Sequence, residues 1–303
     1  MIRRNGLQAW VLASRPKTLT AAMAPVLIGG AYALCQQGWG RYADFSEIWS
    51  KVDIAFYLCL AFAMLMQINA NFINDYFDFK KGADRKDRLG PERACAQGWV
   101  TEKAMKTAIV VVSLLSCAVG FPLVFIGGYW LVIVGVVCVI SAGLYTTKLS
   151  YKGWGDVMVL VFFGFVPVVF TYYCMTLTVD LWVFLLGLAT GLVIDDLLMI
   201  NNYRDRQQDE VSGKRTLVVR LGQRAGLQLY WYVGSFGAVV SYIVLWAKND
   251  PWCLLLMVYL LFHFMTFKKM RKTDGKALNA ILGETSRNIV IFAIVTCVGL
   301  LLH

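Results

Sequence analysis

Nine apolar runs divide this chain of 303 residues, and each has about the length that a helix needs to cross a lipid bilayer. They lie near residues 16–36, 54–78, 104–126, 129–147, 155–174, 181–203, 226–247, 252–267 and 287–302. Hydrophobic residues make up 58% of the chain, which is too many for a soluble domain. The sequence therefore predicts an all-α fold: a polytopic transmembrane bundle of about nine helices, formed by a single domain over residues 1–303.

The positive charges predict how this bundle is oriented. If the N-terminus lies inside, all but three of the 29 Lys and Arg residues fall on the inner side, and the exceptions are Arg41, Lys51 and Lys248. Because positively charged loops remain cytoplasmic, we expect a cytoplasmic N-terminus. The net charge of +10 then follows from membrane topology, so a nucleic-acid partner is not expected; no obligate protein partner is evident from the sequence.

Two short segments of similar sequence, INDYFD at residues 73–78 and INNYRD at residues 200–205, lie at the cytoplasmic ends of the second and sixth runs. Over residues 71–84 the candidate functional side chains are Asn71, Asn74, Asp75, Asp78 and, in the following loop, Asp84. Over residues 201–209 they are Asn201, Asp205 and Asp209, whose i, i+4, i+8 spacing aligns them on one helix face. Carboxylates in a membrane helix cost free energy unless they have partners or a function, so we interpret both clusters as functional.

These side chains offer oxygen ligands without His or Cys. Such ligands suit Mg²⁺, which binds through one or two carboxylates together with the phosphates of a substrate. The candidate metal ligands are Asp75, Asp78, Asp84, Asp205 and Asp209, and all except Asp84 are also the candidate catalytic residues. The loops beside both clusters are rich in Lys and Arg, which could hold the oxygens of a diphosphate. The alternative is that these cations only mark the cytoplasmic face.

Further candidates lie at other helix ends. Tyr145 and Lys148 close the fourth run, where they could stabilise a carbocation and pair with an anion, or merely anchor the helix at the interface. Arg15 and Lys17 flank Pro16 where the first run begins, and they could grip an anion or simply mark a helix start. The candidate substrate-binding residues are Arg15, Lys17, Asn71, Asn74, Lys81, Arg88, Tyr145, Lys148, Asn201, Arg204, Lys214 and Arg215.

Asp195 and Asp196 lie about two turns deeper in the sixth run. They do not form a DDxxD motif, because position 199 is Met. They could line the same cavity, coordinate a metal through water, or pair with a buried cation, and the sequence leaves these alternatives open.

Six segments carry a resemblance that covers nearly the whole chain in order. They are RPKTL at 15–19, NDYFDFKKGAD at 74–84, RLGPERA at 88–94, GWGDVMVLVFFG at 153–164, NNYRDRQQDEVSGKRTLVVRLG at 201–222 and LNAILGETSR at 278–287. In these segments the chain resembles the UbiA family of intramembrane aromatic prenyltransferases. The resemblance implies nine helices, a cytoplasm-side active-site pocket, and Mg²⁺ joining the two motifs to an isoprenyl diphosphate. The family motif carries over to Asn74, Asp75, Asp78, Asn201, Asp205 and Asp209.

Two positions depart from the wider family. A further carboxylate that the family often has four residues after Asp78 is replaced by Gly82, and the resemblance implies that Asp84 takes its part. The family often has a Tyr and a basic residue four apart after the fourth helix, whereas Tyr145 and Lys148 are three apart.

The amino-acid sequences of the motifs most resemble those in the branch of the family that prenylates 1,4-dihydroxy-2-naphthoate. The resemblance then implies transfer of a polyprenyl group from its diphosphate to that acceptor, loss of CO₂, formation of demethylmenaquinol, and a place in a bacterial inner membrane. Other aromatic acceptors, such as 4-hydroxybenzoate, homogentisate or haem, are alternatives. An ion-coupled transporter is a further alternative, because motifs repeated in two halves also occur in transporters.

Overall fold

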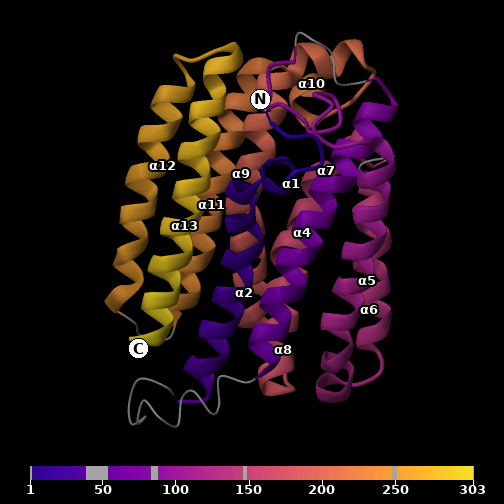
Figure 1. The fold of residues 1–303 in the computed structure, drawn as a ribbon. Coiled ribbons are helices and arrows are strands. Elements are labelled where there is room, and N and C mark those ends of the chain that lie inside the picture. The colour runs from indigo at the N-terminus through magenta and orange to yellow at the C-terminus, as the bar shows by residue number, and fades with distance from the viewer. Residues whose placement is uncertain (1, 39–53, 83–87, 146–148, 248–250, 303) are drawn as a thin grey trace.

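The computed structural model describes residues 2–38, 54–82, 88–145, 149–247 and 251–302, and every regular element within these ranges is a helix (Figure 1). The α-helices are α1 (Leu7–Ser14), α2 (Pro16–Gln36), α4 (Ile54–Lys80), α5 (Glu102–Gly127), α6 (Leu131–Leu144), α7 (Gly155–Val159), α8 (Val166–Thr176), α9 (Leu181–Val211), α10 (Leu217–Leu221), α11 (Gln223–Ala247), α12 (Leu256–Met270) and α13 (Leu278–Leu301). The remaining elements are the 3₁₀ turns η2 (Ser150–Lys152), η4 (Pro251–Leu255) and η5 (Gly275–Ala277), and the π-helical segment η3 (Leu160–Phe165).

The predicted membrane bundle is confirmed. In the described part of the chain, eight helical segments are long and apolar enough to cross a membrane, and α6 is a ninth, shorter apolar helix. One of the eight, Gly155–Thr176, joins α7, η3 and α8 end to end. Each of the nine predicted runs thus corresponds to one helical segment.

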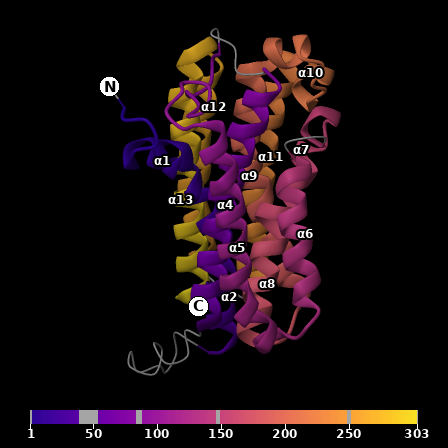
Figure 2. The same cartoon turned by 45° about the vertical axis from the view of Figure 1, so that its right-hand side comes forward.

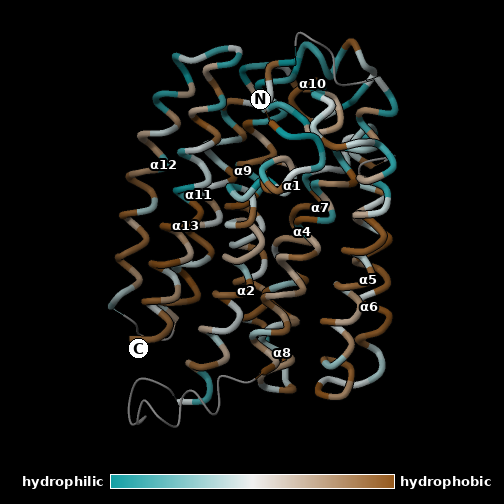
Figure 3. The backbone as a smooth tube through the Cα atoms, viewed as in Figure 1, coloured by the Kyte–Doolittle hydropathy of each residue, from teal (hydrophilic) through white to brown (hydrophobic). Residues whose placement is uncertain are grey.

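Polar residues gather at one end of this bundle. Figure 3 shows hydrophilic residues at the end that carries the N-terminus and α10, whereas the residues along the middle of the helices are predominantly hydrophobic. The C-terminus lies at the opposite end, as an odd number of crossings requires (Figure 1). Both Asp motifs end their helices at the polar end, because they occupy the last turns of α4 and α9.

The centre of the bundle is α9, which packs against α2, α8, α11, α13 and η3. Its contact with η3 is made through glycines. A Cβ atom at Gly164 would lie 2.5 Å from the carbonyl oxygen of Gly187 and 2.8 Å from the Cα of Gly191. The two backbones therefore approach too closely for any side chain at Gly164, as in other membrane helix pairs that pack through small residues.

Some helices extend beyond the predicted runs. Helix α9 continues to Val211 and α13 begins at Leu278, so both carry polar residues past the apolar core. The short helix α1 was not predicted, because eight residues are too few to produce a membrane-length apolar run. It lies beside the bundle near the polar end (Figure 2). There the ring of Trp10 packs against that of Phe72, with 5.5 Å between the two ring centroids.

The close contact at Gly164 generates a prediction about stability. We expect Gly164→Ala to lower the free energy of unfolding by about 2 kcal/mol or more, because the new methyl group meets backbone atoms that cannot move aside independently. Gly283→Ala in α13 is the control, since its added Cβ meets nothing within 4 Å. Thermal unfolding in detergent would compare the two variants, and equal melting temperatures would contradict the packing argument.

Candidate active site

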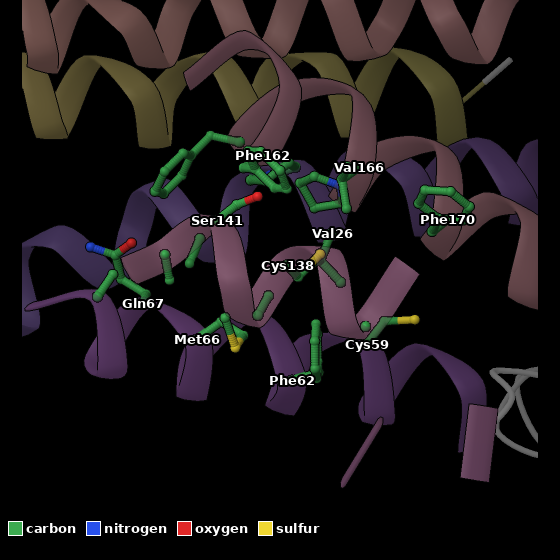
Figure 4. Close-up of a pocket in the computed structure, with 18 of the residues that line it drawn as sticks. Val26, Cys59, Phe62, Met66, Gln67, Cys138, Ser141, Phe162, Val166 and Phe170 are labelled. Carbon is green, nitrogen blue, oxygen red and sulfur yellow. The ribbon is translucent and has the colours of Figure 1, made fainter. Parts of the chain in front are cut away.

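A cavity of about 470 Å³ runs along the interior of the bundle. Its walls come from α2, α4, α5, α6, α7, η3, α8 and α9, and most of the lining side chains are apolar. Figure 4 shows Gln67 and Ser141 toward one end, and Cys59 and Phe170 toward the other. A volume of this size lies within the range of cavities that hold small-molecule ligands.

The polar end of the cavity is built from helix ends that hydrogen bonds hold together. It is lined by Arg15, Thr18, Gln67, Asn71, Asn74, Tyr145 and Asn201. The Thr18 hydroxyl accepts hydrogen bonds from Gln67 Nε2 at 3.1 Å and from Asn71 Nδ2 at 2.9 Å. Asn71 Nδ2 also donates to the carbonyl oxygen of Ser14 at 2.9 Å. The start of α2 is thereby fixed against α4.

Arg15 occupies an unusual position at this end. It joins α1 to α2 with φ 50° and ψ 69°, a left-handed conformation that costs free energy in a residue other than glycine. Burial lowers the pKa of Arg15 to about 9, with a further contribution from the nearby positive charge of Arg93. Its guanidinium is still protonated at neutral pH, but an anion bound beside it would relieve the electrostatic cost of that charge.

In the first motif, both aspartates are engaged. Asp75 is 1% exposed, and its two carboxylate oxygens accept hydrogen bonds from the backbone N–H groups of Ala94, at 2.8 Å, and Cys95, at 3.0 Å. Asp78 forms an ion pair with Arg93, whose Nη2 lies 2.6 Å from Asp78 Oδ2. The first motif therefore holds the loop that follows it.

The second motif is anchored by Arg204, which is only 3% exposed. Its Nε and Nη2 atoms donate to the two oxygens of Asp205, each at 2.7 Å, and Nη1 donates to Asn279 Oδ1 at 2.9 Å. Asp209 lies 3.5 Å from Lys214 Nζ through Oδ1, while its Oδ2 atom is buried and accepts no hydrogen bond from any described group. One buried carboxylate oxygen in this motif therefore has no partner among the described groups, and Asp209 is not part of the cavity lining.

The two motifs converge on Tyr145, which lines the cavity. Burial raises the pKa of Tyr145, and the negative charges of Asp156, Asp195, Asp78 and Asp209 raise it further. Asp78 belongs to the first motif and Asp209 to the second, so both motifs lie close enough to influence the same hydroxyl group. Tyr145 is therefore neutral at physiological pH and can donate a hydrogen bond.

The oxygen groups here fit a hard divalent cation. Within the described ranges, no three His, Cys, Asp or Glu side chains lie close enough to hold a metal ion by themselves. Mg²⁺ does not need such a cage, because it retains waters and takes further oxygens from a phosphorylated substrate. The unpartnered Oδ2 of Asp209, with the carboxylates of Asp78 and Asp205, has the chemistry that this binding mode requires.

The remaining predicted residues lie around this end in different environments. Asn201 lines the cavity and donates to the carbonyl oxygen of Leu197, whereas Lys17 and Arg215 are exposed. Lys81 lies over the ring of Tyr151, with Nζ 4.2 Å from its centroid, and Arg88 Nε donates to the carbonyl oxygen of Pro91. Asp84 and Lys148 lie outside the described residues.

Asp195 and Asp196 are both buried, and neither is part of the cavity lining. Asp196 Oδ2 lies 3.4 Å from Nδ1 of His263 in α12, so this carboxylate faces away from the cavity. Asp195 is instead among the carboxylates whose negative charge raises the pKa of Tyr145. The two neighbours thus point to different sides of α9, as adjacent positions on a helix do.

Three residues of this region were absent from the predicted site, namely Thr18, Gln67 and Asn279, whereas Arg93 belongs to the basic loop whose cations were predicted to hold a diphosphate. Gln67 precedes Asn71 by one helical turn, a spacing that could have revealed it. Thr18 and Asn279 carry no such local signal, because their partners lie on other helices.

Comparison with known proteins agrees with this geometry. The sequence pattern of the UbiA prenyltransferase family matches residues 19–300. The 1,4-dihydroxy-2-naphthoate octaprenyltransferase of Mycobacterium leprae is 34% identical over 290 residues, which cover 94% of this chain and 93% of that protein. The Escherichia coli protein of the same name is 33% identical in an alignment that covers 97% of this chain and 96% of that protein.

Solved structures share the fold at much lower identity. A UbiA homologue from Aeropyrum pernix K1 superposes with a TM-score of 0.67 at 13% identity, covering 91% of this chain and 96% of that chain. A UbiA homologue from Archaeoglobus fulgidus bound to GPP and Mg²⁺ gives a TM-score of 0.63 at 14% identity, and the match covers 96% of this chain and 99% of that chain. The family match, the two bacterial relatives and the shared helical bundle together show that the chain belongs to the UbiA prenyltransferase family.

Proposed function

We propose that this protein transfers a polyprenyl group from its diphosphate to 1,4-dihydroxy-2-naphthoate, with loss of the acceptor carboxylate as CO₂, to give demethylmenaquinol. The observation that carries the proposal is the convergence of two Asn and Asp motifs at the polar end of a long apolar cavity. A substrate with a charged head and a hydrocarbon tail matches that division of polar and apolar surface. The two bacterial relatives named for this reaction support the choice of acceptor.

The roles of the residues follow from their surroundings. The apolar lining would hold the prenyl chain, and Arg15 with the cations of the neighbouring loop would hold the diphosphate. Asp78, Asp205 and Asp209 would hold Mg²⁺, which when bound would neutralise charge on the leaving diphosphate. Asp75 and Asp84 complete the predicted ligand set, and Asp75 would have to release Ala94 or Cys95 in order to join it.

The bonds made and broken balance without a further reactant. The allylic C–O bond breaks and its electron pair leaves with the diphosphate. The ring carbon that carries the carboxylate then forms the new C–C bond, and loss of CO₂ restores the aromatic ring. The neutral hydroxyl of Tyr145 lies where it could donate a hydrogen bond to a substrate oxygen, and preorganised groups of this kind lower the barrier.

We propose the same orientation in the membrane that the sequence predicts, with the polar end of the bundle and the N-terminus in the cytoplasm of a bacterial cell. The segments at that end carry nearly all of the Lys and Arg residues, which supports a cytoplasmic face. We also propose that the chain acts as one domain. The motifs occupy the ends of α4 and α9 rather than the membrane midplane, which favours an enzyme over an ion-coupled transporter.

The first prediction of the proposed function concerns activity. Purified protein incubated with dihydroxynaphthoate, a polyprenyl diphosphate and Mg²⁺ should form a decarboxylated prenyl-naphthoquinol, detected by mass spectrometry, and a chelator should abolish its formation. A parallel mixture with 4-hydroxybenzoate should give no product. Product from hydroxybenzoate alone would transfer the assignment to another acceptor, and no product in either mixture would contradict the enzyme proposal.

The second prediction concerns the proposed metal ligands. Asp78→Ala and Asp205→Ala should each lower kcat by about 100-fold or more, because the leaving diphosphate loses charge compensation. Asp274→Asn is the control, since Asp274 is 71% exposed and lies at the same end in an ion pair with Arg206. Turnover at the wild-type rate in either motif variant would remove that residue from the ligand set.

The third prediction separates Asp75 from the other aspartates. Asp75→Ala should lower the free energy of unfolding by about 2 kcal/mol, because two buried backbone N–H groups lose their acceptors, and Asp75→Asn should fall between that variant and the wild type. Thermal unfolding should be measured in a chelator, where a ligand role makes no contribution. A melting temperature equal to that of the wild type under these conditions would show that Asp75 does not support the loop.

A further inference from the structure

Residues 88–95, here called the strap, connect the two motifs across the polar end of the bundle. At one end of the strap, Arg93 pairs with Asp78, and the backbone N–H groups of Ala94 and Cys95 donate to Asp75. At its other end, the carbonyl oxygen of Leu89 accepts a hydrogen bond from Asn279 Nδ2 at 2.8 Å. The strap is therefore fastened to α4 by its last residues and to α13 by its first ones.

Asn279 also holds the second motif. While its Nδ2 donates to Leu89, its Oδ1 accepts from Arg204 Nη1 at 2.9 Å, and Arg204 in turn holds both oxygens of Asp205. One amide side chain thus joins the strap, which is bound to the first motif, to the arginine of the second. Asn279 itself is not part of the cavity lining, so it acts through these partners rather than on a ligand.

The strap lies directly against Arg204. A Cβ atom at Gly90 would lie 2.8 Å from Arg204 Nη2, so any larger residue there would displace the guanidinium from its present position. Asn279 contacts both sides of this approach, through Leu89 and through Arg204. The relative position of the strap and α9 is consequently set by a short, directional contact rather than by apolar packing.

The position of the strap determines how close its two arginines lie to Arg15. Arg93 and Arg88, both on the strap, lie close enough to Arg15 for their positive charges to act on it, and Arg15 lines the cavity. Leu89, the residue that Asn279 holds, follows Arg88 directly in the chain. Three arginines from two segments are thus brought together; Asp75 and Asp78 offset part of their mutual repulsion, and a bound anion would offset more of it.

We propose that Asn279 is a positioning residue for the diphosphate site: it holds Leu89 and Arg204 together, and so keeps the arginines of the strap and the second motif in the arrangement that receives one anion. This inference rests on the proposed function. Asn279 would contribute to substrate affinity without touching the substrate. The segment that contains it, residues 278–287, has no part in the roles assigned above.

The test compares Asn279→Ala, which removes both hydrogen bonds, with Asn288→Ala on the same helix. Asn288 is 2% exposed and donates to Thr266 Oγ1 at 2.9 Å, so its variant also loses a buried hydrogen bond, but on the α12 side. Asn279→Asp is a second variant, because it retains an acceptor for Arg204 and loses the donor to Leu89. KM and kcat would be measured for the prenyl diphosphate. Trypsin cleavage between Arg88 and Leu89 would be followed by mass spectrometry, with and without inorganic pyrophosphate and Mg²⁺.

We expect both Asn279 variants to raise KM about tenfold with a smaller change in kcat, and to be cut at Arg88 about tenfold faster, as loss of a hydrogen bond to the strap implies. Pyrophosphate with Mg²⁺ should protect the wild type more than either variant, and Asn288→Ala should behave as the wild type. An unchanged KM in the Asn279 variants, or an equal change in Asn288→Ala, would overturn the proposal. If the wild type transfers no prenyl group, the proposed function fails, and protection by pyrophosphate still decides the role of Asn279.

Discussion

Compensation of charge at one end of an apolar bundle is the constraint on which this structure depends. A carboxylate near the hydrocarbon region is costly unless cations or N–H groups surround it. Each of three aspartates has such a partner. The backbone N–H groups of Ala94 and Cys95 donate to Asp75, Arg93 pairs with Asp78, and Arg204 pairs with Asp205, its neighbour in the chain. Because the carboxylates need these partners, the loops at this end are tied to the helices.

The same compensation is incomplete at the points where a ligand would bind. Asp209 retains one buried oxygen without a partner, and Arg15 carries a charge that burial disfavours. In the proposed reaction a divalent cation would bind carboxylate oxygens such as that of Asp209, and an anion would face the Arg15 guanidinium. At these two groups the proposed metal diphosphate would add compensation that the protein itself supplies only in part.

The apolar cavity depends on a different kind of contact. The glycine crossing between η3 and α9 brings these backbones together, and the π-helical turn of η3 carries Phe162 and Phe163 on the cavity wall. Such turns are frequent at functional sites, because one extra residue per turn changes the direction of the following side chains. Close packing on one side of η3 and an open cavity on the other are therefore parts of one arrangement.

The sequence by itself determined the helical class, the number of membrane segments and the two clusters of polar residues, because apolar length and helical spacing are local properties. Asn71, Asn74, Arg15, Tyr145 and Asn201 could be selected from the chain and do line the cavity. The tertiary structure alone decided which groups pair: Arg93 with Asp78, Asp75 with the Ala94 and Cys95 backbone, and Asn279 with both Leu89 and Arg204. These contacts join residues far apart in the chain, so no local periodicity encodes them, and only the packing of the helices brings their atoms within hydrogen-bonding distance.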